Sequence, residues 1–566
     1  MVGRTTRISR YSGHVSIVPS WLQECFVIIS FIVVTVLSSQ HLFSGGYTVI
    51  KSPDFYFHFN RFLGVIESLA AGQGLSRINT LFLEGWGYGS PMFYGDYLLV
   101  IGFVFYKLGF TALTSYKLYL MTLTFLCLLI PYYCSRPVVK NKTIAYFIAL
   151  LYALATFRMY DLFVRNALGE ATAFLFIPLV VLGMWSIKTE KAPRWYYLAL
   201  GMTGLLVTHL LTTILVTIAL AIMVIVDNKA FIRKWDAFSA LVKATLLTVG
   251  LSAFFTLPML EQLKLVPMRI NTDPILQRSM FLTDFGKLLE QSLDNVALYS
   301  ANIGILLLIP IVLRFFVKRD EQNMARLKLA DYTLVIGIIT LLSATSLLPW
   351  ELLFNLSFLS VIQFPFRWLI ITTMMLAISG GIYFYEWSRL FANAQVVRVF
   401  MVLGILLSTM SYNQAVRLAE GEKVVNETAY QPYQIGTGQE YLPVATNRDW
   451  LKEQAGKIRY NQADIRITNS KINHTTIRFD YRDAKNAEVA LPLLNYPGYQ
   501  ALEVATGRKL SLKIGAHYEL MLQGLQGTGK VEVSYQGTFI QKVGLAISIG
   551  TLVLSGYLVY YQRKTR

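Results

Sequence analysis

The chain has 566 residues, of which 54% are hydrophobic and only 15% are charged, and its mean hydropathy is +0.48. This apolar share exceeds that of ordinary soluble domains, and several apolar runs are long enough to cross a bilayer. The composition therefore excludes a simple soluble domain and predicts a polytopic α-helical membrane protein.

The formal charge of +18 is unevenly distributed. Residues 411–540 carry 15 Lys and Arg against 13 Asp and Glu, a balance of +2, so the remaining +16 lies in the apolar part, mostly in short loops. Basic residues in short loops mark the cytoplasmic side of a membrane protein, so no nucleic-acid partner is expected. The three cysteines lie in or beside apolar runs and imply no disulfide framework.

Apolar length predicts about twelve transmembrane helices. They are 22–42, 116–134, 142–157, 170–187, 195–208, 211–226, 238–258, 299–317, 329–347, 366–386, 396–411 and 541–561. The first run lacks a small-residue cleavage site, so we expect it to be retained. The loops expected inside are basic throughout, which places both termini in the cytoplasm of a plasma-membrane protein.

Basic loops alternate with less basic ones along the chain, and this inside–outside alternation holds only if the apolar segment 92–112 does not cross the membrane. We therefore expect 43–115 to form one long outer loop with two juxtamembrane helices. Residues 1–411 are then a membrane domain, and 541–566 are the last helix with a basic tail.

Residues 412–540 differ in kind, because short β-type runs alternate with Gly, Asn and Lys turns. These runs are 464–468, 475–481, 488–494, 499–504, 517–522 and 530–535. They predict a compact antiparallel, sandwich-like β domain on the extracytoplasmic side.

The segment Ser52–Arg61 follows the first span and mixes ionisable groups with aromatic residues. Asp54, His58 and Arg61 are spaced i, i+4, i+7, which places them on one face of a helix. Two interpretations stay open: a polar site for an anionic, partly apolar ligand, or a helix in the headgroup layer.

Arg158, Asp161, Arg165 and Glu170 crowd another outer loop. Ionisable groups at membrane depth are costly unless they are paired or used, and arginine suits phosphate because its fork is planar and always charged. The alternative is an Asp161–Arg165 pair that only fastens the loop. Arg367, in Gln363-Phe-Pro-Phe-Arg-Trp, is either a ligand-binding group or an interfacial anchor.

Other motifs fail. Gly524 to Lys530 has the spacing of a phosphate-binding loop, but Val531 stands where Ser or Thr is required, and the segment lies between predicted strands. The sequence contains no zincin or serine-hydrolase motif. His209, at the outer end of a span, is expected to be a hydrogen-bonded structural residue.

Four features together resemble a known group. They are Pro53-Asp54 with Arg61, the run Arg165 to Ala171, Gln363 to Arg367, and Leu494-Asn-Tyr-Pro-Gly498. They resemble bacterial polytopic proteins termed 6-pyruvoyl-tetrahydropterin synthase-related, and YfhO-like proteins, which are similar to the GT-C glycosyltransferase superfamily. Members of that superfamily take a sugar from a polyprenyl-phosphate carrier on the outer membrane face.

The resemblance implies roles for individual residues. Asp54 matches the first-loop acid and is the expected catalytic residue. His58, Arg61, Arg158, Asp161, Arg165, Glu170 and Arg367 are expected to bind substrate. Many GT-C enzymes carry a second acid where Phe55 follows Asp54 here, so no metal ligands are assigned and a divalent cation stays open.

The implied function is transfer of a sugar from a polyprenyl-phosphate donor to a cell-envelope glycan, lipid or protein acceptor. Two alternatives remain: a transporter or flippase for lipid-linked glycans, which would place charges near mid-membrane, and a non-catalytic envelope assembly protein, whose membrane-edge acid and arginines would be replaceable.

Overall fold

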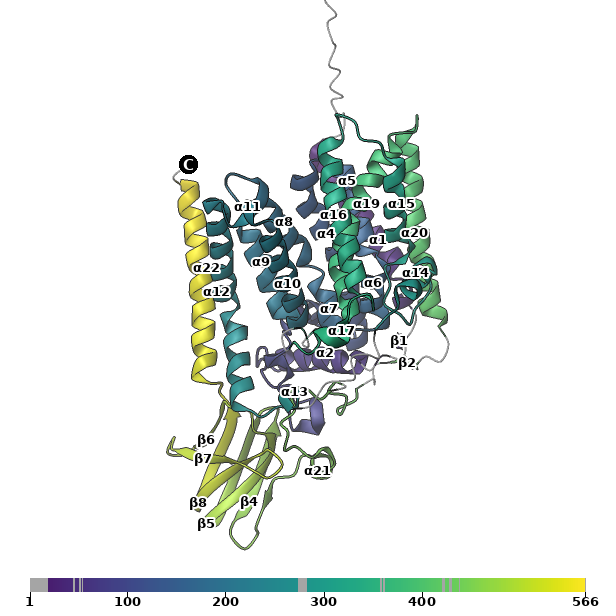
Figure 1. Cartoon of the computed structure of the whole chain (residues 1–566). Helices are drawn as coiled ribbons and strands as arrows, with labels where there is room; N and C mark the ends of the chain where they lie inside the picture. Colours follow the sequence, from purple (N-terminus) through teal and green to yellow (C-terminus); the bar gives the residue numbers. More distant parts are fainter. Residues whose placement is uncertain are drawn as a thin grey trace, which may run out of the picture.

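The computed structural model describes residues 19–43, 46–49, 52, 54–272, 282–356, 359, 362–419, 423–426, 430–436 and 438–564. A body of roughly aligned helices carries a β-sheet at one end (Figure 1). The last helix runs beside α12 from the sheet to the opposite end of the body. Pro53 of the predicted motif lies outside the described residues.

The first half of the chain is almost entirely helical. Its α-helices are α1 (Ser20–Ser38), α2 (Asp54–Ala70), α3 (Val100–Lys107), α4 (Ala112–Val139), α5 (Lys142–Ala153), α6 (Thr156–Met159), α7 (Leu168–Ala173), α8 (Ile177–Thr189), α9 (Tyr196–Thr208), α10 (Leu210–Val226), α11 (Asn228–Phe231) and α12 (Trp235–Leu265).

The second half adds the remaining helices and the sheet. Its elements are α13 (Arg269–Thr272), α14 (Phe285–Leu293), α15 (Gly304–Leu313), α16 (Met324–Ser343), α17 (Trp350–Leu353), α19 (Leu369–Ser388), α20 (Ala394–Leu418), α21 (Arg448–Glu453) and α22 (Phe539–Lys564), with strands β1 (Tyr47–Val49), β2 (Lys423–Val425), β3 (Arg459–Tyr460), β4 (Arg466–Asn473), β5 (Thr476–Leu494), β6 (Tyr499–Glu503), β7 (Lys509–Ile514) and β8 (Glu519–Tyr535).

The protein is a multi-pass membrane protein. Within the described residues, seven helices are long and apolar enough to cross a membrane, or eight if the bent pair Lys142–Ala153 and Thr156–Val164 is one span. Every predicted span overlaps a helix, but α9 and α10 have only 13 and 17 residues, and about 20 are needed to cross. The predicted fold class is confirmed, whereas seven or eight helices meet the length criterion instead of about twelve.

Segment 92–112 contains one apolar helix, Tyr97–Lys107, in which the 3-10 turn η4 (Tyr97–Leu99) runs into α3. Such a helix is about 17 Å long, well short of the roughly 30 Å of a bilayer core. The expectation that this segment does not cross agrees with that length.

The helix α19 lies at the centre of the bundle, since 94% of its apolar window is buried. It packs against α5, α15 and α16. Gly381 allows the close approach of α5, because a Cβ there would lie 2.9 Å from the backbone nitrogen of Ile148. Helix α19 is therefore tightly enclosed by its neighbours.

The β domain is antiparallel as predicted, but its strands form one six-stranded sheet instead of the two layers of a sandwich. Its backbone order is β3-β5-β8-β6-β7, and β4 also pairs with β5. The predicted turns near residues 482–487 and 523–529 lie inside β5 and β8. Register shifts and positive φ angles at Asp483, Asn486, Gly524 and Gly527 let these long strands bend without ending.

The segment between α1 and α4 is joined to the chain after α20. Strand β1 pairs with β2, and Asn60 of α2 donates to the carbonyl oxygen of Gln431 at 2.6 Å. Helix α20 extends to Leu418, so the predicted boundary at 411 lies inside this helix; α22 begins at Phe539, next to the predicted boundary at 540.

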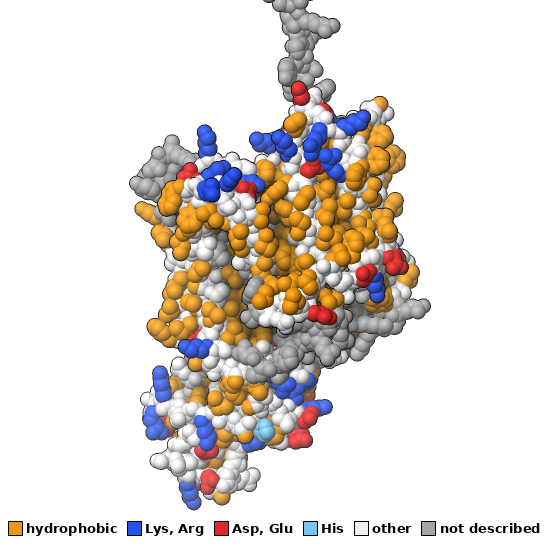
Figure 2. All heavy atoms as spheres, viewed as in Figure 1, with side chains coloured by type: hydrophobic (Ala, Val, Ile, Leu, Met, Phe, Trp, Pro, Cys, Tyr) orange, Lys and Arg blue, Asp and Glu red, His pale blue; other side chains and the backbone are white. Residues whose placement is uncertain are grey.

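Figure 2 shows Lys and Arg side chains gathered over the end of the helical body that lies away from the sheet, with apolar side chains between that end and the sheet. This separation agrees with the basic loops expected from the sequence.

We expect Gly183→Ala to destabilise the bundle, because its Cβ would lie 2.3 Å from the backbone nitrogen of Leu198 on α9. Overpacking of this kind typically costs about 1–3 kcal/mol. Thermal unfolding of the detergent-solubilised protein measures the loss. Gly404→Ala on α20 is the control, since no atom lies within 4 Å of the added carbon; equal melting temperatures would contradict this packing.

Candidate functional site

The helix α2 lies at the end of the helical body nearest the sheet (Figure 1). Its aromatic face is buried, because Phe55 stacks on Tyr47 with ring centroids 4.9 Å apart and Phe59 and Phe62 pack edge-on against Tyr116 of α4. Asp54 occupies the first turn, where a negative charge suits the helix dipole. The predicted helix is therefore present, and its aromatic residues fix its position.

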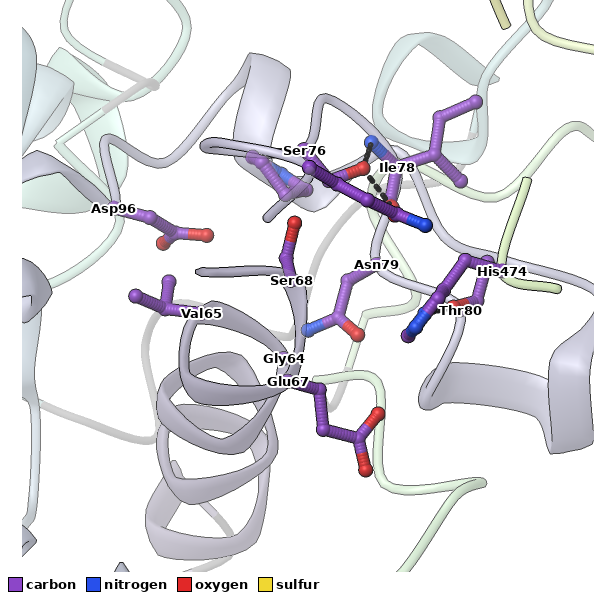
Figure 3. Close-up of a pocket in the computed structure, with 12 residues that line it drawn as sticks. Gly64, Val65, Glu67, Ser68, Ser76, Ile78, Asn79, Thr80, Asp96 and His474 are labelled. Atoms are coloured by element: carbon purple, nitrogen blue, oxygen red, sulfur yellow. Dashed lines mark hydrogen bonds between the residues drawn. The ribbon is translucent and has the colours of Figure 1, made fainter. Parts of the chain in front are cut away.

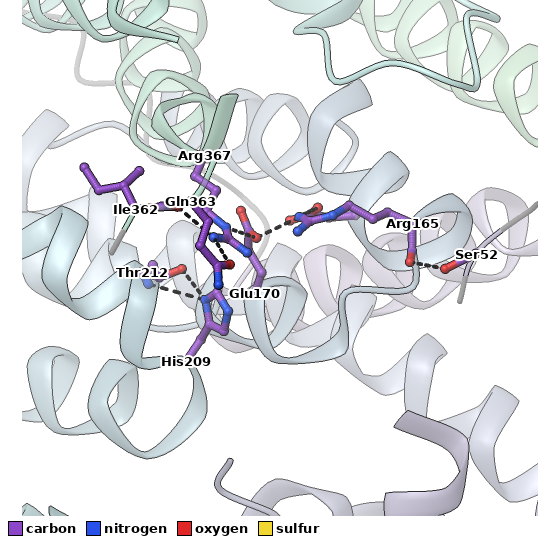
Figure 4. A network of polar contacts seen from close by, with 9 residues as sticks. Ser52, Arg165, Glu170, His209, Thr212, Ile362, Gln363 and Arg367 are labelled. Carbon is purple, nitrogen blue, oxygen red and sulfur yellow. Dashed lines mark hydrogen bonds and ion pairs between the residues drawn. The ribbon is translucent and has the colours of Figure 1, made fainter. Parts of the chain in front are cut away.

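Two arginines and two acids form a buried network beside it (Figure 4). Arg165 Nη1 lies 2.9 Å from Asp161 Oδ1 and 2.8 Å from Glu170 Oε2. Arg367 Nε reaches the same Glu170 oxygen at 3.1 Å. Glu170 thus links two parts of the chain through its two arginine partners. Arg165 directly follows the π-helical turn η5 (Tyr160–Val164), and Arg367 lies in η8 (Pro365–Trp368), which precedes α19. The structure brings these four predicted residues together.

Each guanidinium group keeps an unused edge. Arg367 Nη1 donates to the carbonyl oxygen of Ile362 and to Gln363 Oε1, at 2.7 and 2.9 Å. No described residue accepts a hydrogen bond from Nη2 of Arg165 or Arg367. The two groups can therefore donate to a further acceptor.

Aromatic rings and strained backbone surround the pair. The carbon atoms of the Arg165 and Arg367 guanidiniums lie 5.8 and 4.8 Å from the centroid of the Phe364 ring. Asn166 and Gln363 have positive φ angles of 55° and 63°. Non-glycine residues rarely adopt this conformation, and such strain gathers at functional sites.

Asp54 is influenced by the charges of this network but is not bonded to it. Its carboxylate makes no hydrogen bond or ion pair with any described residue. Burial raises the pKa of Asp54, Arg165 and Arg367 oppose that rise, and Glu170 adds to it. The acid is therefore within electrostatic reach of both arginines but outside direct contact.

His58 and Arg61 belong to a second cluster with Asp96. Asp96 Oδ1 accepts from Arg61 Nε and Nη2 at 2.9 and 2.5 Å, and His58 Nδ1 lies 2.8 Å from Arg61 Nη1. All three residues are at most 6% exposed. Burial lowers the pKa of His58 well below its ordinary value, and Arg61 lowers it further, so His58 is neutral and accepts from Arg61.

Arg158 lies apart from both clusters. It is fully buried, and it donates to the carbonyl oxygen of Ala153 at 3.2 Å and to Thr124 Oγ1 at 3.1 Å. The first contact caps the end of α5, and the second joins α6 to α4. These contacts are those of a residue that fastens helices together.

Several residues of the site were not singled out from the sequence. Tyr94 lies between the clusters, with its ring centroid 4.7 Å from the Arg61 guanidinium carbon and 6.1 Å from the centroid of His209. Glu440 comes from the segment that precedes the sheet, and Asp54 contributes to the upward pKa shift that burial causes there. Both residues are far from Asp54 in the sequence and carry no motif.

His209 is hydrogen-bonded as predicted. Its Nδ1 lies 2.7 Å from Thr212 Oγ1, and the side chain caps the start of α10.

A metal centre has no obvious ligands in the part of the chain that the structure describes, where no group of three or more His, Cys, Asp or Glu could hold an ion. Asp161 and Glu170, the closest candidates, already receive the Arg165 guanidinium. An arginine therefore occupies the place between these carboxylates that a cation would take.

No family model matches the sequence. An uncharacterized protein of Lactococcus lactis subsp. cremoris (strain MG1363) is 27% identical over 253 residues, which cover 43% of this chain and 40% of that protein. The chain thus matches less than half the length of this curated relative. The crystal structure of ArnT from Cupriavidus metallidurans bound to undecaprenyl phosphate is similar over 74% of this chain and 78% of that chain, with 13% identity and a TM-score of 0.38.

We expect Asp96→Asn to lower stability strongly, because Arg61 would remain buried without its carboxylate. Removal of one partner of a buried ion pair costs about 3–5 kcal/mol. Thermal unfolding measures this loss. The double variant Arg61→Met/Asp96→Asn removes the stranded charge and should recover part of it, and a double variant less stable than Asp96→Asn would contradict the pairing.

Proposed function

We propose that this protein is a GT-C-type membrane glycosyltransferase that moves a sugar from a polyprenyl-phosphate donor to an acceptor of the cell envelope. The proposal depends on one observation: Asp54 lies within electrostatic reach of two arginines, Arg165 and Arg367. The Nη2 group of each arginine makes no hydrogen bond with a described residue. The reaction needs a carboxylate to accept a proton and guanidinium groups to bind the phosphate.

In the proposed step, the acceptor hydroxyl oxygen attacks the anomeric carbon of the sugar. The bond from that carbon to the phosphate oxygen breaks, and the phosphate leaves with the electron pair as polyprenyl phosphate. Asp54 takes the hydroxyl proton. Arg165 and Arg367 stabilise the negative charge of the leaving phosphate, which is the role of preorganised donors in a water-poor site.

Asp54 fits the role of base because burial raises its pKa. A base whose pKa is closer to the operating pH transfers protons more effectively than an ordinary carboxylate. Arg165 and Arg367 oppose that rise in the pKa of Asp54.

The surroundings fit a lipid-linked substrate. Phe364 and Phe366 stack with ring centroids 5.3 Å apart beside the arginines, and apolar helices begin directly after them. A phosphate held there would lie at the end of the apolar body, from which a prenyl chain can extend along the helices. The basic end of the body lies on the opposite side (Figure 2), so we place the site and the sheet outside the cell and both termini inside.

Two features weigh against the other candidate functions. Asp54 and the arginine network lie at one end of the helical body, whereas a transporter is expected to hold its charges near mid-membrane. The backbone strain at Asn166 and Gln363 costs stability that an assembly protein would have no reason to retain.

We expect Asp54→Asn to abolish donor turnover in a folded protein. Purified protein receives candidate undecaprenyl-phosphate sugars together with a glycan-containing envelope extract, and released undecaprenyl phosphate is measured with and without EDTA. Loss of a general base typically costs about 10²–10⁴-fold in rate. EDTA decides whether a divalent cation takes part.

Asp236→Asn is the matched control, because Asp236 is exposed at the start of α12. Equal release by wild type and Asp54→Asn would remove Asp54 as the base. No release by any variant with any donor would favour the transporter or the assembly protein.

The pH profile of turnover should have an acid limb above the ordinary aspartate pKa of about 3.9. The base form is needed, and burial raises the pKa of Asp54, so the rate falls as pH drops through that raised value. Initial rates measured from about pH 4 to 9 locate the limb. A limb that does not move in Asp54→Glu would belong to the substrate or to another group.

A further inference from the structure

The long helix α12 passes from one apolar core of the protein into another. Its first half contributes Ala237, Ala240 and Ala244 to the core of the helical bundle. Its second half contributes Phe255 and Met259 to the core of the sheet. The change from one core to the other therefore falls between Ala244 and Phe255, within a single continuous helix.

At the end of this interval, both backbone polar groups of Phe254 are bonded to side chains from outside α12. The Phe254 N–H donates to Ser548 Oγ of α22 at 2.9 Å, and the same hydroxyl donates to the carbonyl oxygen of Gly250 at 2.9 Å. A regular α-helix pairs this N–H directly with that carbonyl oxygen, so the Ser548 hydroxyl stands between them. Side chains inserted into a helix in this way bend it.

The carbonyl oxygen of Phe254 also lacks its usual helical partner. Four residues further along stands Pro258, which has no N–H to donate. Arg77 Nη2, from the loop after α2, donates to this oxygen at 2.9 Å instead. Two interruptions of the helix thus meet at one residue, and a side chain from a distant part of the chain satisfies each of them.

The loop that carries Arg77 is tied to α2. The Ser76 hydroxyl donates to the carbonyl oxygen of Ile78 at 2.6 Å and accepts from the Ile78 N–H at 3.2 Å, which closes a turn around Arg77 (Figure 3). Asn79 Nδ2 donates to the carbonyl oxygen of Asn60, on α2, at 3.2 Å. The arginine therefore connects α12 to the helix that begins with the candidate catalytic acid.

The part of α12 beyond Phe254 is joined to the sheet domain. Gln262 Nε2 donates to the carbonyl oxygen of Pro497 at 3.1 Å. After α12 ends, the Ile270 N–H donates to the carbonyl oxygen of Glu440 at 3.0 Å. The outer part of α12 therefore holds the chain around Glu440 as well as the sheet.

The chain around Glu440 forms one side of the candidate site. Tyr441 stacks on Phe93 with ring centroids 4.3 Å apart, and its centroid lies 6.2 Å from that of Tyr94. The Tyr94 ring lies over the guanidinium of Arg61, which belongs to α2. A change in the bend of α12 would therefore move this side of the site relative to α2.

From these contacts we propose that Ser548 and Arg77 are positioning residues for the site. They hold α12 bent at Phe254, and the bend sets where Glu440 and Tyr441 lie relative to α2. The consequence for catalysis rests on the proposed glycosyltransferase function. The placement of the segment does not, and it can be measured without any substrate.

We expect Ser548→Ala to straighten α12, because the Phe254 N–H can then pair with Gly250 in the regular way. Pro258→Ala should act in the same direction, since it restores an N–H for the Phe254 carbonyl oxygen. A change in bend of about 20° moves the end of α12, about 17 Å from Phe254, by about 6 Å.

The test measures the distance between two spin labels on the full chain in lipid nanodiscs, by double electron–electron resonance. One label replaces Glu290, which is exposed on α14 of the bundle, and the other replaces Lys509, which is exposed on β7. Cys25→Ser removes the exposed cysteine. We expect the mean distance to shift by about 3–6 Å in both Ser548→Ala and Pro258→Ala.

Hydrogen exchange of the peptide 438–446 gives a second readout at the site itself. The Tyr441 N–H donates to the Tyr88 hydroxyl at 3.0 Å, and we expect its exchange to be faster in both variants. Ser555→Ala is the matched control, since Ser555 Oγ donates to the carbonyl oxygen of Thr551 in its own helix at 2.7 Å. It should leave the distance and the exchange unchanged.

Equal distances in wild type, Ser548→Ala and Pro258→Ala would overturn the proposal, and so would a shift of the same size in Ser555→Ala. A shift without faster exchange around Tyr441 would overturn the role at the site.

Donor turnover should fall about tenfold or more in Ser548→Ala, because small displacements of a site are costly in rate. Unchanged turnover in a shifted Ser548→Ala protein would also overturn the role at the site. A shifted distance with faster exchange, together with no donor turnover by the wild type, would keep the positioning role and remove the glycosyltransferase function.

Discussion

The organisation of the site depends on one buried carboxylate. Glu170 Oε2 receives Arg165 at 2.8 Å and Arg367 at 3.1 Å, from two segments nearly two hundred residues apart. Two guanidiniums at this spacing would repel each other without an acid between them. Because Glu170 is fully buried, its charge is poorly screened, and its loss would leave Arg367 without a carboxylate and Arg165 with Asp161 alone. The bridge through Glu170 thus keeps both arginines within electrostatic reach of Asp54.

A second constraint holds the acid side of the site. Asp54 is the first residue of α2, and α2 is fixed by stacked rings on one face and by the Arg61–Asp96 pair on another. The arginine network lies on other elements: Arg165 follows η5, Glu170 is in α7, and Arg367 is in η8, which leads into α19, the most buried of the long helices. Asp54 and the arginines therefore stand on separate elements of the fold.

Sequence patterns predicted what local chemistry determines. Apolar length located the helices, and the i, i+4, i+7 spacing located the polar face of α2. The spacing also led to the Asp161–Arg165 pair, which is 2.9 Å apart. The spacing of residues could not reveal that Asp96 pairs with Arg61 or that Arg158 donates to Thr124 inside the bundle. Nor could it reveal that β5 and β8 continue through bulges. Each of these features depends on partners distant in the chain. Short spans such as α9 show why length alone miscounts crossings.

The ties between α2 and the segment after α20 also bear on how the protein is made. Asn60 and Gln431 are separated by 371 residues, and β1 must wait for β2 before it has a partner. During synthesis the segment between α1 and α4 emerges long before these partners exist. The Asp54 end of α2 can take its final form only after the chain beyond α20 has been made and has reached it. In a nascent or truncated chain the surroundings of Asp54 are therefore incomplete, and they are completed last, when the segment that leads into the sheet is delivered.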